Sequence, residues 1–182
     1  MQYSEWIFFH KNVHLFERHG RVAMAAFVGY VVQSNFVFPW SKFAGNPPPS
    51  IDLSPQEQWD AIGMAAQVQI IAFVGFLEWY SELSDNGNGP HYTKGGKPGQ
   101  FPTFDNVPHS VPFNLYDPFK LSKNRSEEDK AKGLITEINN GRLAMLGIFG
   151  FLAESAIPGS VPVLTGVVKP YSGEIMAPFA MN

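Results

Sequence analysis

Three apolar segments alternate with polar loops along the chain, and their lengths predict helices that can cross a membrane. They cover residues of about 15–38, 55–82 and 127–157. The stretch from Glu137 to Ile157 would make roughly 31 Å of helix at about 1.5 Å per residue, which matches a bilayer core. A long loop (83–125) and an irregular tail (158–182) complete what we expect to be one domain of 182 residues. We therefore predict an all-α integral membrane fold with three transmembrane helices.

Local signals set the ends of these helices. Pro39 and Trp40 follow the first segment, and proline disfavours helix in the residue before it. Ser54, Pro55 and Glu57 have the spacing of a capping box with proline in the first helical position, which predicts a helix running from residue 55 to about 82. Acidic residues from Glu127 onward are typical of a helix start.

The first and third segments contain the same motif. Residues 19–30 align without gaps on residues 140–151, and both copies read Gly-Arg-x-Ala-Met. Small residues recur at every third position in each copy: Gly20, Ala23, Ala26, Gly29 and Gly141, Ala144, Gly147, Gly150. Such stripes allow two helix backbones to approach closely. We expect the two helices to cross there, related by a pseudo-two-fold axis.

The charged residues of the repeat need partners, because a charge inside an apolar span is costly. Each arginine of the repeat, Arg21 and Arg142, can reach an acid on the other helix. The pair that we favour is Arg21 with Glu137. Such an ion pair would leave no net charge in the lipid. We expect it to join the two helices even if the acid also binds a ligand.

Composition narrows the function further. The net charge is −3 and argues against nucleic acid as a partner, and the absence of cysteine excludes thiolate metal sites. The loop from Ser81 to Gly133 holds seven Lys or Arg residues, whereas residues 41–55 and the tail hold one each. Basic segments stay on the side of synthesis. The N-terminus and the long loop should therefore share one face of the membrane.

Isolated polar side chains interrupt the apolar helices and suggest single-donor ligation. These are His19, Gln67, Gln69, Glu78, Glu137, Asn140 and Glu154. They are too dispersed for a metal cage, but a magnesium ion already held by a macrocycle needs only one axial oxygen or nitrogen donor. The alternatives are ordinary ones: Asn140 and Gln69 as interhelical hydrogen bonds, Glu78 as a helix-end acid, and His19 as a buried hydrogen-bonded histidine.

The doubled motif resembles the signature of the chlorophyll-binding light-harvesting antenna superfamily. It reads Glu137-x-x-Asn140-Gly-Arg142-x-Ala-Met and, in the first copy, His19-Gly-Arg21-x-Ala-Met. Further stretches resemble most the fucoxanthin–chlorophyll a/c-binding proteins of diatoms and related algae: Gln33-Ser34-Asn35-Phe36, residues 75–82, residues 91–99 and residues 157–162.

The resemblance implies a set of pigment ligands. The axial donors to chlorophyll magnesium would be Glu137, Asn140, His19, Glu154, Gln69 and Glu78, and Asp117 would receive a carotenoid end group. The cofactors implied are chlorophyll a, chlorophyll c, fucoxanthin or related xanthophylls such as diadinoxanthin, and structural lipids.

Several positions depart from the family pattern. The acid expected three residues before His19 is replaced by Phe16, and Glu17 lies one residue off, about 100° around the helix. Either Glu17 ligates magnesium and meets Arg142, or that chlorophyll is lost or held differently. Gln69 is one residue out of register with Glu78, so Gln67 stays open as the ligand.

The resemblance implies an antenna subunit rather than an enzyme. It would lie in the plastid thylakoid membrane with a stromal N-terminus and a lumenal C-terminus. Its partners would be neighbouring antenna subunits and a photosystem core, with photosystem I favoured. The alternatives are a photoprotective, energy-dissipating member of the superfamily, a small transporter that uses Glu137, Arg21 and Arg142, and a soluble helical enzyme.

Overall fold

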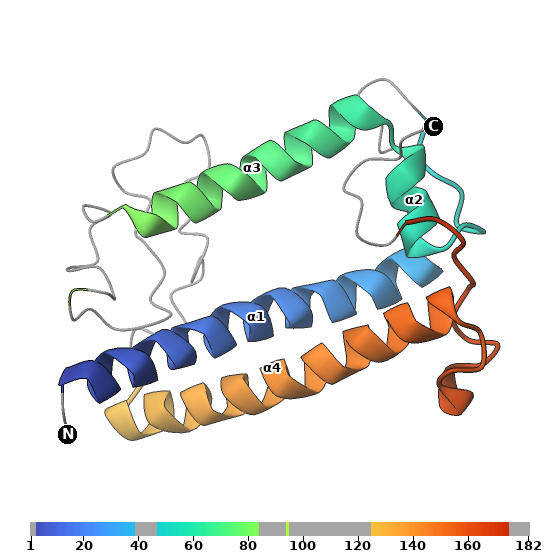
Figure 1. The fold of residues 1–182 in the computed structure, drawn as a ribbon. Helices are drawn as coiled ribbons and strands as arrows, with labels where there is room; N and C mark the ends of the chain where they lie inside the picture. Colours follow the sequence, from blue (N-terminus) through green and yellow to red (C-terminus); the bar gives the residue numbers. More distant parts are fainter. Residues whose placement is uncertain (1–2, 39–46, 84–93, 95–124, 175–182) are drawn as a thin grey trace. The chain divides into compact units, whose positions relative to one another are not determined.

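The computed structural model describes residues 3–38, 47–83, 94 and 125–174, and for residues 3–16 it describes only the backbone. Four α-helices follow one another in this part of the chain: α1 (Tyr3–Asn35), α2 (Pro55–Ala61), α3 (Met64–Glu82) and α4 (Glu127–Ala156). A short 3-10 turn, η2 (Pro162–Leu164), follows them (Figure 1). The prediction of an all-helical chain is confirmed for the described residues.

The chain forms two compact units. The first contains Met1–Arg21 and Gly75–Arg142, and the second contains Val22–Val74 and Leu143–Asn182. Their boundaries fall inside α1, α3 and α4, so each unit holds one part of these helices. We describe the contacts of each unit separately.

Helix α1 is longer than the predicted first span. It begins at Tyr3 rather than near residue 15, and it ends at Asn35 rather than near Phe38. Ser34 and Asn35 bond with their side chains to the carbonyls one turn before them, Tyr30 O at 2.7 Å and Val31 O at 2.8 Å. These bonds satisfy the polar side chains within the helix itself. The predicted stop at Pro39 and Trp40 lies outside the described residues.

The predicted continuous helix over residues 55–82 is wrong, because α2 and α3 are separate and bent by 109°. The predicted capping box is confirmed: Ser54 caps α2 and bonds reciprocally with Glu57. The helix ends at Ala61, with Ile62 as its C-cap, because Gly63 has a φ of +79°, the left-handed conformation that stops helices. Gln67 donates from α3 to Trp59 O at 2.9 Å and fixes the bend.

Helix α4 matches its predicted span of 127–157. The hydroxyl of Ser126 accepts from Asp129 N at 3.1 Å, and three acids occupy the first turn. At the other end Glu154 accepts two backbone N–H groups from the turn that follows, Gly159 N at 2.9 Å and Val161 N at 2.8 Å. A side chain thus satisfies the start of α4, and Glu154 fixes the turn that follows its end.

None of the described helices is, by itself, both long enough and apolar enough to cross a membrane. The bent pair α2 and α3 passes that test only when its two helices are taken together.

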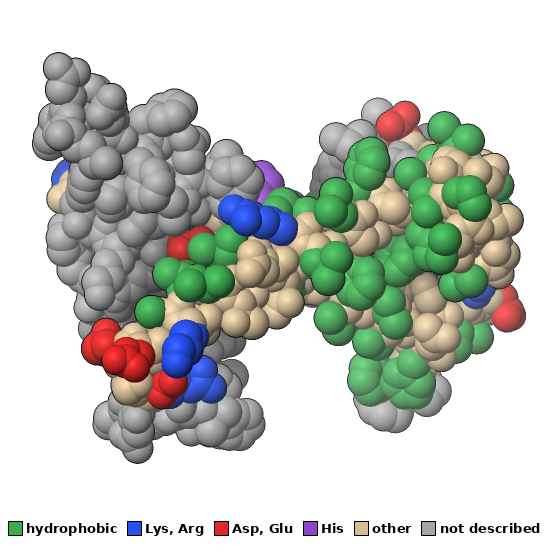
Figure 2. Space-filling model, turned by 90° about the horizontal axis from the view of Figure 1, so that it is seen from below, with side chains coloured by type: hydrophobic (Ala, Val, Ile, Leu, Met, Phe, Trp, Pro, Cys, Tyr) green, Lys and Arg blue, Asp and Glu red, His purple; other side chains and the backbone are tan. Residues whose placement is uncertain are grey.

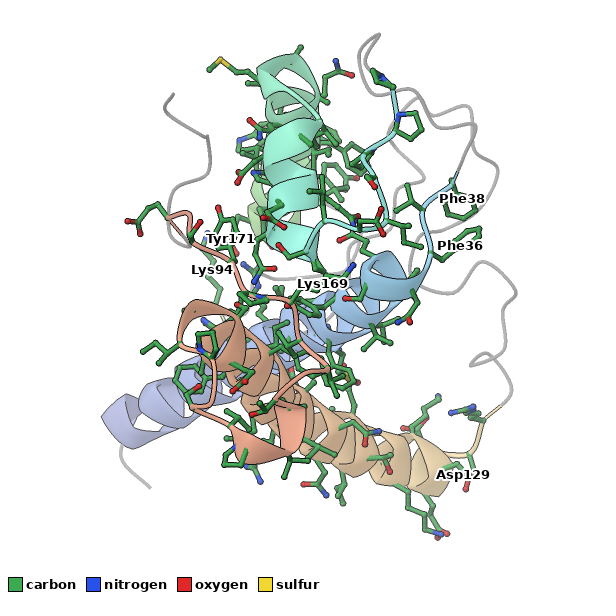
Figure 3. All side chains as sticks on the ribbon, turned by 90° about the vertical axis from the view of Figure 1, so that its right-hand side faces the viewer. Phe36, Phe38, Lys94, Asp129, Lys169 and Tyr171 are labelled. Carbon is green, nitrogen blue, oxygen red and sulfur yellow. The ribbon has the colours of Figure 1, made fainter. Side chains whose placement is uncertain are left out.

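In the second unit, the segment after η2 holds α2 and the end of α4. Lys169 Nζ donates to Ile51 O at 2.7 Å, and Tyr171 Oη lies 2.9 Å from Asp60 Oδ2 on α2. Tyr171 N also donates to Ser155 O at 2.8 Å. Figure 3 shows Lys169 and Tyr171 on this segment, beside α2. The tail is irregular over its described part, as predicted, but it is fixed by specific contacts.

Tyr171 should titrate at unusually high pH. Burial raises the pKa of its hydroxyl to about 12, and the hydrogen bond and negative charge of Asp60 act in the same direction. An unfolded tyrosine titrates near pH 10. Because the folded pKa is the higher one, the neutral phenol stabilises the attached tail below about pH 10. This contribution is lost as the pH rises toward about 12.

The test compares phenolate absorbance during an alkaline titration of the native protein and of Tyr171→Phe. The difference should show one phenol that titrates near pH 12. A difference curve centred near pH 10 would mean that Tyr171 is not held against Asp60 in solution.

Candidate functional site

In the first unit, α1 and α4 touch through two glycines of the repeated motif. A Cβ built on Gly141 would lie 2.8 Å from Gly20 Cα, and a Cβ built on Gly20 would lie 3.2 Å from Gly141 Cα. Only glycine allows the two backbones to come this close. The predicted close approach of the two helices is therefore confirmed at the first small residue of each copy.

The predicted ion pair between Arg21 and Glu137 lies next to this contact. Arg21 Nε donates to Glu137 Oε1, and the side chains are 24 % and 32 % exposed. Arg21 follows Gly20 directly, and Glu137 precedes Gly141 by one helical turn, so the glycine contact brings the two charges together. The second oxygen of Glu137, Oε2, has no hydrogen bond recorded with any described residue.

The second predicted pair, Glu17 with Arg142, is not found among the described residues. Glu17 is only 6 % exposed and its Oε2 has no hydrogen-bond partner there, whereas Arg142 is exposed. The charges that act on Glu17 are those of Arg21, one turn further along the same helix, and of Glu137 on α4. The reason is the position of the acid along α1. Phe16 occupies the position that is equivalent to Glu137, and Glu17 lies one residue later, about 100° around the helix.

The small-residue stripe does not continue as a backbone contact in the second unit. Gly147 packs against the ring of Phe27, and Gly29 has nothing within 4 Å of a built Cβ. Phe151 stacks on Phe27 and on Tyr30, with ring centroids 5.1 Å and 5.0 Å apart. In the second unit the two helices are thus in contact through aromatic rings, and the small size of Gly147 makes room for the ring of Phe27.

The predicted donor residues fall into three environments. His19, Asn140 and Gln69 are exposed on their helices. Glu137 and Glu78 are each bound to an arginine through one carboxylate oxygen. Gln67 is buried and occupied at the α2–α3 bend. Of the two glutamines left open by register, Gln69 is thus the one available to a ligand.

Glu78 is bound by Arg18, which no sequence motif singles out. Arg18 Nη1 donates to Glu78 Oε2 at 2.9 Å, while Nη2 lies 2.5 Å from Glu82 Oε1 and 3.1 Å from Ser81 Oγ. These contacts join α1 to α3 within the first unit. No motif or spacing links Arg18 to residues sixty positions later, so only the fold reveals the pair.

Glu154 has a different role in this structure. It is 2 % exposed, and each carboxylate oxygen accepts one backbone N–H from the turn after α4. A magnesium ligand needs an oxygen that an incoming macrocycle can reach. Both oxygens of Glu154 hold the turn after α4, so magnesium ligation would require the turn to release one of them, and the assignment of Glu154 as a ligand stays a prediction. Asp117 lies outside the described residues.

Apolar side chains surround the exposed donors. On α4, Leu143, Leu146 and Phe149 are all exposed, and on α3 the exposed residues include Val68, Ile71, Phe73 and Trp79. Figure 2, which views the molecule from below, shows hydrophobic side chains in green over much of the visible described surface. Over the described ranges, no group of three or more His, Asp or Glu side chains could hold a metal ion.

Single oxygen and nitrogen donors on helices with exposed apolar side chains, together with ion pairs between helices, make up the candidate site of this helical protein. Comparison with known proteins gives the particular family. The profile described as "Chlorophyll A-B binding protein" matches residues 16–156. The chain belongs to this family of light-harvesting, chlorophyll-binding proteins.

Several similar proteins are fucoxanthin-chlorophyll a-c binding proteins. A fucoxanthin-chlorophyll a-c binding protein of Trieres chinensis is 33% identical over 156 residues, which cover 81% of this chain and 66% of the relative. Protein F of Phaeodactylum tricornutum is 31% identical over 77% of this chain and 62% of its own length, and protein B of Macrocystis pyrifera is 29% identical over 83% and 62%. The chain thus spans less than two thirds of the length of these relatives.

Proposed function

We propose that this protein is a light-harvesting antenna subunit of the plastid thylakoid membrane. It would bind chlorophyll a, chlorophyll c and fucoxanthin or a related xanthophyll, with lipids filling the remaining apolar surface. The observation that carries the proposal is the Arg21–Glu137 pair at the Gly20–Gly141 contact. Bound pigments absorb light and pass on excitation, while the protein supplies axial donors, fixed spacing and local polarity.

The proposed axial donors are the residues of the predicted set whose side chains are exposed or half-buried. They are Glu137, Asn140, His19, Gln69 and Glu78. Glu137 and Glu78 suit this role because an arginine neutralises each carboxylate, so that ligation leaves no net charge at the site. Glu17 is a further candidate through its unpartnered Oε2, although it lies away from Arg142. Glu154 would join this set if the turn after α4 released one of its carboxylate oxygens.

We also propose the membrane arrangement expected from the sequence. The helix α1, the bent pair α2–α3 and α4 would provide three crossings, with α1 and α4 related by a pseudo-two-fold axis. The uneven distribution of Lys and Arg supports a stromal N-terminus and a lumenal C-terminus. The partners would be neighbouring antenna subunits and a photosystem core, with photosystem I favoured. A photoprotective role would show itself as a shortened excited-state lifetime in strong light.

Asn140→Leu tests the ligand assignment with a close control. Asn140 and Asn139 are adjacent, both are exposed, and both lie on α4. Asn140→Leu should lower the chlorophyll content of the purified protein by one molecule per chain, because leucine offers no donor to magnesium. Asn139→Leu should leave the content unchanged. Equal pigment content in the two variants, measured by chromatography of extracted pigment, would refute the assignment.

A further inference from the structure

Arg18 lies between two acids of another helix, and this arrangement is unusual for a simple ion pair. Glu78 and Glu82 are four residues apart on α3, so their side chains share one face of that helix. Two like charges in this position repel each other. The guanidinium of Arg18, from α1, divides its two terminal nitrogens between them.

The pairing leaves one oxygen of Glu78 available. Arg18 binds Oε2, while Oε1 has no hydrogen bond or ion pair recorded with the described residues, and the side chain is 57 % exposed. The aromatic residues nearest in sequence lie on other faces of α3, where Phe76 packs against Trp79 and Tyr80 with centroids 6.1 Å and 6.2 Å away. A carboxylate that is held by one oxygen and open at the other matches the needs of an axial donor to a magnesium macrocycle.

The same pattern occurs at Glu137, which supports a common role. There Arg21 of α1 binds Oε1 of an acid on α4. Arg18 and Arg21 are three residues apart on α1, and each carries a positive charge to an acid on a different helix. Helix α1 therefore supplies the counter-charge for three acids, two on α3 and one on α4.

We infer that Arg18 is a positioning residue for Glu78: it neutralises the carboxylate, fixes Oε2 and so presents Oε1 to a chlorophyll magnesium. This inference rests on the proposed function, because it needs Glu78 to be an axial ligand. If Arg18 only joined α1 to α3, the contacts would be the same. Replacing Glu78 with neutral glutamine would then not restore the chlorophyll that is lost in Arg18→Leu.

The experiment uses the full chain assembled with its pigments, and it reads chlorophyll content and the absorption difference from the native protein. Glu78→Leu should remove one chlorophyll, and Arg18→Leu should remove the same one, with the same absorption difference. Glu78→Gln should retain it, because a neutral amide oxygen needs no counter-charge. The decisive variant is Arg18→Leu combined with Glu78→Gln, which should regain the chlorophyll. Glu82→Gln, the control on the same helix face, should keep it.

Each other outcome has a definite meaning. If Arg18→Leu keeps all chlorophyll, or if the double variant does not regain the lost molecule, Arg18 has only a structural role and the inference is wrong. If Arg18→Leu alone does not assemble, the chlorophyll content of the double variant still tests the inference: a full content supports it, and a missing chlorophyll contradicts it. If Glu78→Leu loses no chlorophyll, the inference fails at Glu78, whereas the proposed function is tested separately by Asn140→Leu.

Discussion

Arg21→Leu is expected to reduce the yield of assembled, pigmented protein by at least about tenfold. It would leave the Glu137 carboxylate without its cation beside the closest contact of α1 and α4. Removing one partner of a fully buried ion pair costs about 3–5 kcal/mol, because the remaining charge stays uncompensated, and the loss should be smaller for this half-buried pair. In a membrane, no water reaches such a site to restore solvation. The measurement is the yield and thermal stability of the pigmented protein.

Arg142→Leu is the matched control for this prediction. It changes the equivalent arginine in the second copy of the motif, which is exposed and has no ion pair recorded within the described part of the chain. Its effect on yield should be clearly smaller than that of Arg21→Leu. Equal losses in both variants would show that the Arg21–Glu137 pair has no special importance.

Gly141→Leu is the second change with a large expected effect. Even the Cβ of a side chain at this position would lie 2.8 Å from Gly20 Cα, and both are backbone-fixed positions that cannot move aside alone. Overpacking of an interior usually costs about 1–3 kcal/mol, and here it would also separate Arg21 from Glu137. We expect a strong fall in thermal stability and the loss of pigment from the first unit.

Gly133→Ala serves as the comparison on the same helix. A Cβ at Gly133 meets nothing within 4 Å, so alanine should be tolerated or even stabilise α4 through its higher helix propensity. The contact between α1 and α4 would not be the site of tight packing if Gly141→Leu were as stable as Gly133→Ala.

The parts of the structure that local sequence signals determine were predicted correctly. The capping box at Ser54 and the acids at the start of α4 act through neighbouring residues, so their positions follow from the sequence. The Arg21–Glu137 pair was also predicted, because the repeat aligns α1 with α4 and indicates which residues meet.

Other features depend on distant contacts or on one backbone angle. Gly63 lies in an otherwise helical pattern, and nothing nearby distinguishes a helix break from a tolerated glycine. Arg18 meets acids sixty residues away, which only the packing of α3 decides. Glu154 was assigned as a ligand from its position in a pattern, but the turn after α4 brings two N–H groups to it.

Pigment analysis of the purified full chain tests the proposed function most directly. An absorption spectrum with chromatography of the extracted pigments should show chlorophyll a, chlorophyll c and a xanthophyll bound in a fixed ratio to protein. A folded but colourless protein, or one with pigment in no reproducible ratio, would contradict the proposal that these helices hold chlorophyll through single side-chain donors.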